Sequence, residues 1–239
     1  MNIIGELINA SRKRIARAIK EGDAEAIQNV ARDEEQAGAA FIDVNAGVFQ
    51  EREVEYLRWL VQTVQQVVQV PCSIDSPSAR ALEAALEVHQ GPRPIINSIS
   101  LEKERFDSVL PLVQGGHVNV IALCMSDDGM PEATDQRLAI ADQLISRLVQ
   151  RGVPLEQIYV DALVQPISTN DSYCVQFLGA VRQIMERYPG IHTICGLSNV
   201  SFGLPKRKIL NRALAVMGIA NGLDSAICNP LDDKLMSAI

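Results

Sequence analysis

Polar side chains stand at the ends of short apolar segments all along this chain, and such side chains could together line a ligand-binding pocket. A buried carboxylate or amide costs free energy unless it is hydrogen-bonded, so this many polar groups predict a ligand rich in donors and acceptors. Taken singly, each residue could instead end a strand or cap a helix. The residues are Glu6 and Asn9, Asp43 and Asn45, Asp75, Asn97, Ser126 and Asp127, Asp161, Ser198 and Asn199, and Asn229.

Two carboxylates, Asp75 and Asp161, carry the clearest chemistry. A carboxylate accepts two parallel hydrogen bonds, as from the amino-pyrimidine edge of guanine or a pterin, and Asn97 can both donate and accept beside it. No His, Cys or Lys stands at a strand end as an evident nucleophile or base, and the three histidines are expected to be partly exposed and non-catalytic. The five cysteines include no C-x-x-C pair, which favours free buried thiols over disulfides or a metal site.

The elements that must position these residues follow from the hydrophobic pattern. Eight short apolar runs alternate with segments of helical spacing, as parallel strands and crossover helices do. Closure of eight strands removes both sheet edges, so the pattern predicts a single (β/α)8 TIM barrel domain over residues 1–239. The runs are Ile3–Gly5, Ala40–Val44, Cys72–Ile74, Pro94–Ile96, Val118–Leu123, Ile158–Val160, Thr193–Cys195 and Ser225–Ile227.

Helix signals agree with this alternation. Apolar stripes run from Val54 to Val68, from Phe106 to Val113 and from Leu138 to Leu148. Asp23 and the Ser76-Pro77 pair are expected to open helices. After the last strand, a helix start at 229–233 is followed by only a few residues, so the eighth helix is predicted to be truncated. Either the native protein is longer than this chain, or another surface covers that side of the barrel.

Composition limits the classes of partner. The formal charge of −7 disfavours a general nucleic-acid surface or an anionic membrane surface. The amino terminus has no secretory pattern, and no apolar stretch is long enough to span a membrane. These observations predict a cytoplasmic protein that binds neither nucleic acid nor membrane.

Several motifs resemble a known family. The most specific is Gly-Leu-Ser-Asn-Val-Ser at 196–201, accompanied in order by Ile-Ile-Gly-Glu at 3–6, Asp-Val-Asn at 43–45, Ser-Ile-Asp-Ser at 73–76, Ile-Ile-Asn-Ser at 95–98 and Tyr-Val-Asp at 159–161. Together they resemble the pterin-binding barrel family over essentially the whole chain. Within it, the chain is similar to methyltetrahydrofolate:corrinoid protein methyltransferases and to the folate domain of cobalamin-dependent methionine synthase.

This resemblance implies roles for particular residues. Asp75, Asn97 and Asp161 would hold the pterin ring. Asn199 would lie near N5, the nitrogen that carries the methyl group. The remaining expected site residues are Gly196 and Ser198, which would shape the wall beside N5, Arg207, which would approach the folate, and Glu6, as a supporting residue.

The implied reaction moves the N5 methyl group between methyltetrahydrofolate and the cobalt of a corrinoid (cobalamin). The Asn199 amide would donate a hydrogen bond that strengthens as N5 becomes basic, which stabilises the transition state more than the ground state. No histidine stands in a D-x-H-x-x-G pattern, so a separate corrinoid protein is the expected transient partner. The resemblance also implies a homodimer.

Two other functions stay open at this point. Dihydropteroate synthase shares this fold and pterin pocket, but it is expected to show a Lys-bearing motif where this chain has Ser198-Asn199. A folate-binding or assembly subunit without turnover is the second alternative.

Overall fold

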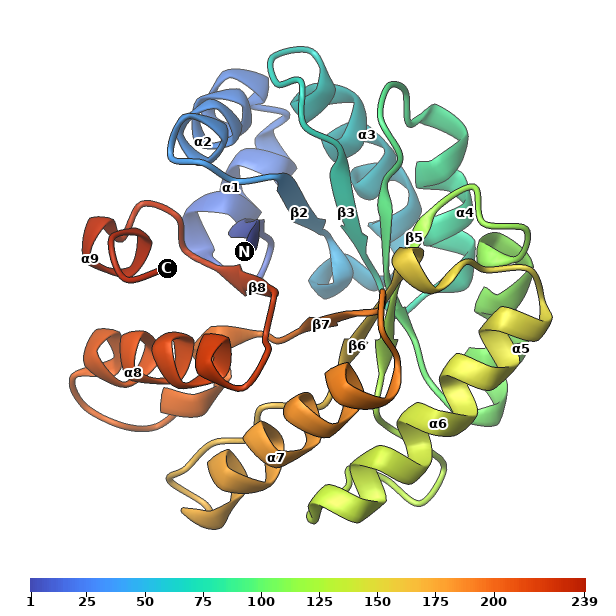
Figure 1. Ribbon diagram of the computed structural model, residues 1–239. Coiled ribbons are helices and arrows are strands. Elements are labelled where there is room, and N and C mark those ends of the chain that lie inside the picture. Colours follow the sequence, from blue (N-terminus) through green and yellow to red (C-terminus); the bar gives the residue numbers. More distant parts are fainter. The chain divides into compact units, whose positions relative to one another are not determined.

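The computed structural model describes residues 1–239 and confirms the (β/α)8 order that the sequence predicts. All eight predicted strands form, and each is followed by at least one helix (Figure 1). The chain divides into two compact units. The amino-terminal unit comprises residues 3–98 and 229–231, and the carboxyl-terminal unit comprises residues 1–2, 99–228 and 232–239. The single domain over 1–239 stays a prediction.

The amino-terminal unit is built on four strands that pair in parallel in chain order, with their helices outside them (Figure 1, blue to green). The strands are β1 (Asn2–Asn9), β2 (Phe41–Asn45), β3 (Cys72–Asp75) and β4 (Ile95–Ile99). The helices are α1 (Lys13–Glu21), α2 (Ala24–Gln36), the 3-10 helix η1 (Gly47–Arg52), α3 (Glu53–Gln65) and α4 (Ala79–Val88).

The carboxyl-terminal unit repeats the plan. Its strands β5 (Asn119–Leu123), β6 (Ile158–Asp161) and β7 (His192–Ile194) pair in parallel. The last strand is β8 (Ser225–Cys228), whose Ile227 forms a parallel bridge with Gly196. The helices are α5 (Lys103–Val113), α6 (Thr134–Gln150), η2 (Leu155–Gln157), α7 (Ser172–Arg187), η3 (Leu197–Ser201), α8 (Arg207–Ala220) and α9 (Asp233–Met236).

Packing follows the predicted stripes. On α3, Leu57, Leu60 and Val64 are fully buried, because the apolar positions recur at helical spacing on one face. Val68 is buried but lies beyond the end of α3. None of the helices combines the length and the apolar character needed to cross a membrane.

Caps explain where the helices begin. Asp23 accepts a hydrogen bond from the Ala26 amide at 3.0 Å, which confirms it as the N-cap of α2. The predicted start at Ser76-Pro77 is two residues early, since Ser78 accepts from the Ala81 amide and caps α4.

The helix after β8 is short, as the sequence predicts. The Asp232 side chain caps it by accepting from the Leu235 amide, and the same carboxylate accepts from Arg212 Nη2 of α8 at 2.6 Å. The C-terminal turn is thereby fixed to α8.

Candidate functional site

A row of polar side chains crosses the four strands of the amino-terminal unit. Asn9 pairs in register with Asn45, Asn45 with Asp75, and Asp75 with Asn97. Because parallel strands in register place paired residues at one level, the sheet itself aligns these groups. Asp75, which the sequence singled out, is half-buried and accepts a hydrogen bond from Asn45 Nδ2 at 2.8 Å.

A second polar layer lies two residues earlier along the strands. Asp43 is 3% exposed, and its Oδ1 accepts from Ser73 Oγ at 2.7 Å and from Asn97 Nδ2 at 3.3 Å. Burial, with a further contribution from the nearby Asp75 carboxylate, raises the pKa of Asp43 well above its usual value. Asp43 therefore holds the Asn97 amide in place and favours its own protonated form.

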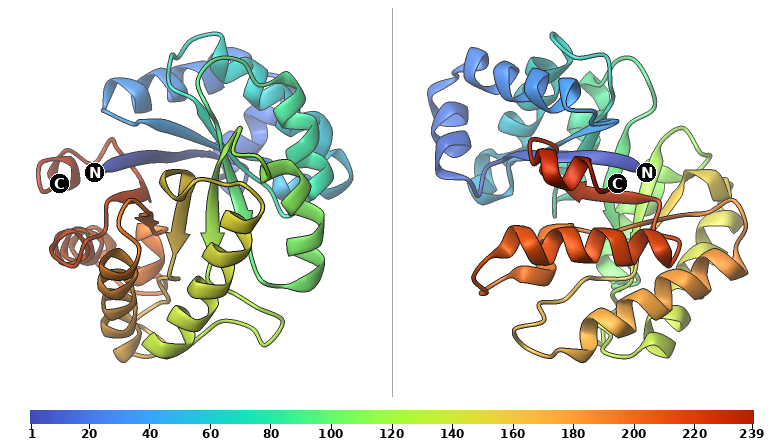
Figure 2. Two further views of the ribbon diagram at one scale, coloured as in Figure 1. Left: turned by 45° about the vertical axis from the view of Figure 1, so that its right-hand side comes forward. Right: turned by 60° about the vertical axis from the view of Figure 1, so that its left-hand side comes forward.

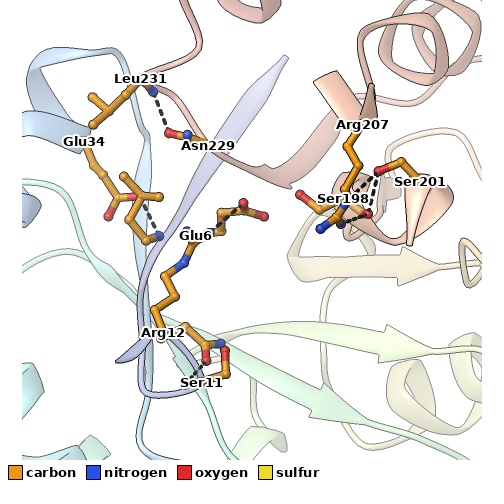
Figure 3. A network of polar contacts seen from close by, with 11 residues as sticks. Glu6, Ser11, Arg12, Glu34, Ser198, Ser201, Arg207, Asn229 and Leu231 are labelled. Carbon is orange, nitrogen blue, oxygen red and sulfur yellow. Dashed lines mark hydrogen bonds and ion pairs between the residues drawn. The ribbon is translucent and has the colours of Figure 1, made fainter. Parts of the chain in front are cut away.

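A second buried carboxyl group, that of Glu34 on α2, lies against strand β1 (Figure 3). The register of β1 shifts between Gly5 and Ile8, and in this irregular stretch the Leu7 amide donates to Glu34 Oε1 of α2 at 2.9 Å. Glu34 is fully buried and its Oε2 has no hydrogen-bond partner. Burial raises the pKa of Glu34 to about 8, although the Leu7 hydrogen bond opposes the shift.

The expected supporting residue Glu6 lies in the same irregular stretch. Its Oε1 accepts from Arg12 Nη2 at 2.9 Å, and its side chain is mostly covered (Figure 3). Glu6 is thus part of a charged group in the irregular stretch of β1, where it also acts on the Glu34 carboxyl group.

In the carboxyl-terminal unit, Asp161 ends β6 between apolar neighbours. Its partners in register are Leu123 on β5 and Ile194 on β7. The side chain is 8% exposed, and Oδ1 accepts from the Leu163 amide at 2.8 Å. Burial raises the pKa of Asp161 to about 7, against the opposing effects of that hydrogen bond and of the Arg137 guanidinium.

The Gly-Leu-Ser-Asn-Val-Ser motif forms the 3-10 helix η3 directly after β7. Asn199 is exposed on this turn, and its Nδ2 lies 3.0 Å from the point that a Cβ on Gly196 would occupy. A side chain at position 196 would therefore press on the Asn199 amide. Glycine at this position leaves the amide room.

Arg207, the first residue of α8, forms hydrogen bonds to the turn that carries Asn199 (Figure 3). Its Nη2 donates to the Ser198 carbonyl oxygen at 2.8 Å, and its Nε donates to Ser201 Oγ at 3.0 Å. The Ser201 hydroxyl in turn lies 2.7 Å from Asn211 Oδ1. Arg207 thus binds this turn on both sides of Asn199, at the Ser198 backbone and at the Ser201 side chain.

Other polar strand-end residues have local roles. Asp127 accepts from the Lys103 amide at the start of α5, and Asn229 Oδ1 accepts from the Leu231 amide at 2.9 Å (Figure 3). His192 Nδ1 lies 2.6 Å from Asp224 Oδ2, which raises the pKa of the imidazole through that hydrogen bond. No group of three His, Cys, Asp or Glu side chains could hold a metal ion. All five cysteines are free, and all but the half-buried Cys174 are buried.

Sequence reasoning missed two residues, Glu34 and Arg137. Both are fully buried, although their side chains are charged in water. A signal was available: Glu34 follows Ile27 and Ala31 at helical spacing, and Arg137 precedes Ala141 on the same kind of apolar stripe. A charged residue on an apolar stripe is the pattern that would have found them.

Comparison with known proteins supplies the family. Residues 5–229 match the family described as pterin binding enzyme. The chain is 33% identical over 241 residues to a methylcorrinoid:tetrahydrofolate methyltransferase of Eubacterium limosum, covering 100% of this chain and 89% of that protein. It is 29% identical over 238 residues to a methionine synthase of Mycobacterium leprae, covering 94% of this chain and 20% of that protein.

Solved structures show the same fold. A dihydropteroate synthase of Coxiella burnetii in complex with pteroic acid matches with a TM-score of 0.73 and 13% identity, over 99% of this chain and 91% of that one. A dihydropteroate synthase of Thermus thermophilus matches with a TM-score of 0.66 and 18% identity, over 99% and 91%. At these identities the likeness concerns the (β/α)8 fold alone.

Proposed function

Since the chain belongs to the family of pterin binding enzymes, we propose that it is a methyltransferase acting on the N5 methyl group of methyltetrahydrofolate. The methyl group moves between N5 and the cobalt of a corrinoid that a separate protein carries. The observation that carries this proposal is the likeness to the Eubacterium limosum methyltransferase along the entire chain. Tetrahydrofolate and its methyl derivative are the substrates.

Asp75, Asn97 and Asp161 bind the pterin ring in this proposal. Their chemistry fits, because a pterin edge offers N–H donors to carboxylates and both kinds of partner to an amide. Asn97 is already oriented by Asp43, which accepts from its Nδ2. With a pKa of about 7, Asp161 changes between acceptor and donor near neutral pH.

Asn199 is the proposed catalytic residue. When the bond between N5 and the methyl carbon breaks, its electron pair stays on N5, which becomes more basic and takes a proton from water. An amide N–H of Asn199 hydrogen-bonds to N5 and stabilises this developing basicity, an effect typically worth about 3 kcal/mol. Gly196 leaves space for the amide, and Arg207 holds the turn through Ser198. Glu6 supports the irregular stretch of β1 rather than contacting the ligand.

The corrinoid supplies a cobalt centre that can accept or release the methyl group when its protein docks. Docking must be transient, because the carrier has to leave with its cargo, and this favours an interface of modest area. The proposal includes a cytoplasmic location, since five free thiols suit a reducing compartment.

A homodimer is also part of the proposal, and helix α8 supports it (Figure 2, orange-red). Its outer face carries Ile209, Val216 and Met217, which are 59%, 51% and 45% exposed, while other residues of α8 are buried. These positions recur at helical spacing, and an apolar stripe of this kind suits the self-complementary contact of two identical helices. Sedimentation should show a dimer that Val216→Glu converts to a monomer, whereas Gln183→Glu on α7 leaves it intact.

The test is methyl transfer followed by visible spectroscopy. Purified protein is mixed with methyltetrahydrofolate and a cobalt(I) corrinoid, and methylcobalt formation is recorded for the wild type, Asn199→Ala, and Asn29→Ala, an exposed control on α2. We expect transfer that falls about 100-fold in Asn199→Ala alone, with folate binding retained.

Two other results would contradict the proposal. Folate binding without any methyl transfer would identify a non-catalytic folate-binding subunit. Formation of dihydropteroate from a pterin pyrophosphate and p-aminobenzoate would identify a dihydropteroate synthase.

A further inference from the structure

Arg137 on α6 is a fully buried arginine in the unit that contains Asp161. Its guanidinium donates to backbone carbonyls: Nε to Ala162 O at 2.8 Å, Nη1 to Glu132 O at 2.5 Å and Nη2 to Leu163 O at 3.5 Å. Burial of a charge costs free energy, so a guanidinium held by carbonyls alone calls for a compensating negative charge nearby.

The Asp161 carboxylate interacts with this guanidinium through space rather than by a direct ion pair. Arg137 and Asp161 attract each other, and the attraction lowers the pKa of the carboxyl group against the larger effect of burial. The other ionisable groups facing Asp161 are Cys124 and Cys195, and burial raises the pKa of each thiol well above its usual value, so both are neutral. Arg137 also faces Tyr173 of α7. Arg137 is therefore the cation that favours ionisation of Asp161.

Arg137 also fixes the backbone beside that carboxylate. Leu163 has a φ of +62°, a conformation that costs a non-glycine residue about 1–3 kcal/mol and persists only where its surroundings hold it. Its carbonyl is held by Arg137 and its amide donates to Asp161 Oδ1. One guanidinium thus supports the segment that fixes the rotamer of the Asp161 side chain.

The supported segment continues toward the Asn199 turn. The Ile167 amide donates to the Val200 carbonyl oxygen at 3.1 Å, and Ser168 Oγ donates to the Phe202 carbonyl oxygen at 2.8 Å. The loop that Arg137 holds therefore makes hydrogen bonds to the turn that carries Asn199.

We propose that Arg137 is a positioning residue for folate binding, which holds Ala162 and Leu163 so that Asp161 presents an ionised, oriented carboxylate to the pterin. This inference rests on the proposed function. It adds a residue that contacts no ligand and acts through both its charge and its planar fork of donors.

The test separates charge from geometry in the full-length protein. Folate affinity is measured from about pH 5.5 to 8.5, a range that brackets the Asp161 pKa of about 7, for the wild type, Arg137→Met, Arg137→Lys, and Arg147→Met, an exposed arginine of the same helix. Arg137→Met should weaken binding about tenfold at neutral pH and move the pH midpoint of binding upward by about one unit. Arg137→Lys should keep the midpoint but bind more weakly at every pH, because an ammonium cannot reproduce the planar fork that reaches the backbone carbonyls.

A second readout does not depend on folate. Carbon-13 NMR of the aspartate carboxyl groups in the ligand-free protein should show the pKa of Asp161 raised in Arg137→Met and little changed in Arg137→Lys. If the wild type binds no folate, the proposed function fails while this titration still tests Arg137. An unchanged pH midpoint and an unchanged Asp161 titration in Arg137→Met would overturn the inference. If that variant does not fold, an affinity in Arg137→Lys equal to wild type would do so.

Discussion

The two units treat their buried carboxyl groups differently. In the amino-terminal unit, Asp43 and Glu34 are buried beside other carboxylates, and burial raises the pKa of both. In the carboxyl-terminal unit, Asp161 is also buried and its pKa rises to about 7, but the charged group that acts on it is a guanidinium rather than a carboxylate. The two units therefore differ in the sign of the charge that lies near their buried acids.

This difference has a physical origin in the neighbours along the sheet. Asp43 and Asp75 share a polar surface of amides and hydroxyls, where like charges discourage ionisation. Asp161 has the apolar residues Leu123 and Ile194 as its partners on the neighbouring strands. The charged group that acts on it is Arg137, which lies on helix α6. We conclude that neighbouring carboxylates favour the neutral form of Asp43 and Glu34, whereas the charged neighbour of Asp161 is a cation, which favours its ionised form.

The largest expected effect sets Asp161→Asn against Asp43→Asn. Asp161→Asn should weaken folate binding about 1000-fold at about pH 8, because two charge-assisted hydrogen bonds are lost. Asp43→Asn should change affinity less than about threefold, because the amide resembles the protonated acid. Calorimetric titration of both variants measures this, and equal losses would abolish the distinction between the units.

Glu34→Gln tests the neutral acid through stability. A raised pKa in the folded state means that the contribution of Glu34 is fully present below pH 4.5 and is lost as the pH rises through about 8. At pH 8 the variant should be more stable than the wild type by ~4 kcal/mol, with little difference near pH 4.5. Urea unfolding at several pH values measures both, with Glu25→Gln, an exposed change on α2, as control. Parallel pH profiles would show that Glu34 is ionised in the folded protein.

Gly5→Ala tests how tightly Glu34 is packed. A Cβ at this position would lie 2.4 Å from Glu34 Oε1 and 2.6 Å from its Cδ, so a buried side chain must move. We expect a loss of ~2 kcal/mol in the free energy of unfolding, as in other overpacked cores. The double variant Gly5→Ala/Glu34→Ala should not show that additional cost. Additive losses in the double-mutant cycle would mean that the two residues do not interact.

Gly196→Ala is the matched change in the other unit and has the smallest expected effect on stability. Its Cβ would meet the flexible, exposed end of Asn199 at 3.0 Å, so the melting temperature should hardly change. Methyl transfer should fall about tenfold, because the amide is displaced from N5. Stopped-flow measurement of the methyl-transfer rate, with folate affinity measured in parallel, tests this expectation. An unchanged rate in Gly196→Ala would argue against a catalytic role for Asn199.

The sequence by itself determined the alternation of strands and helices and the polar strand ends. Apolar periodicity is a local property, and residues at the ends of parallel strands come to one edge of a sheet wherever the helices lie. The sequence therefore predicted that Asp75 and Asn97 lie at the same edge of the sheet, and the two residues pair in register on adjacent strands.

Only the tertiary structure decided which acids are neutral and what holds the site residues in place. The burial of Glu34 and Arg137 depends on how α2 and α6 pack on their sheets, and the binding of Arg207 to the Asn199 turn depends on how α8 folds back. Desolvation and pairing act over a few ångströms between residues distant in sequence, so no local pattern specifies them.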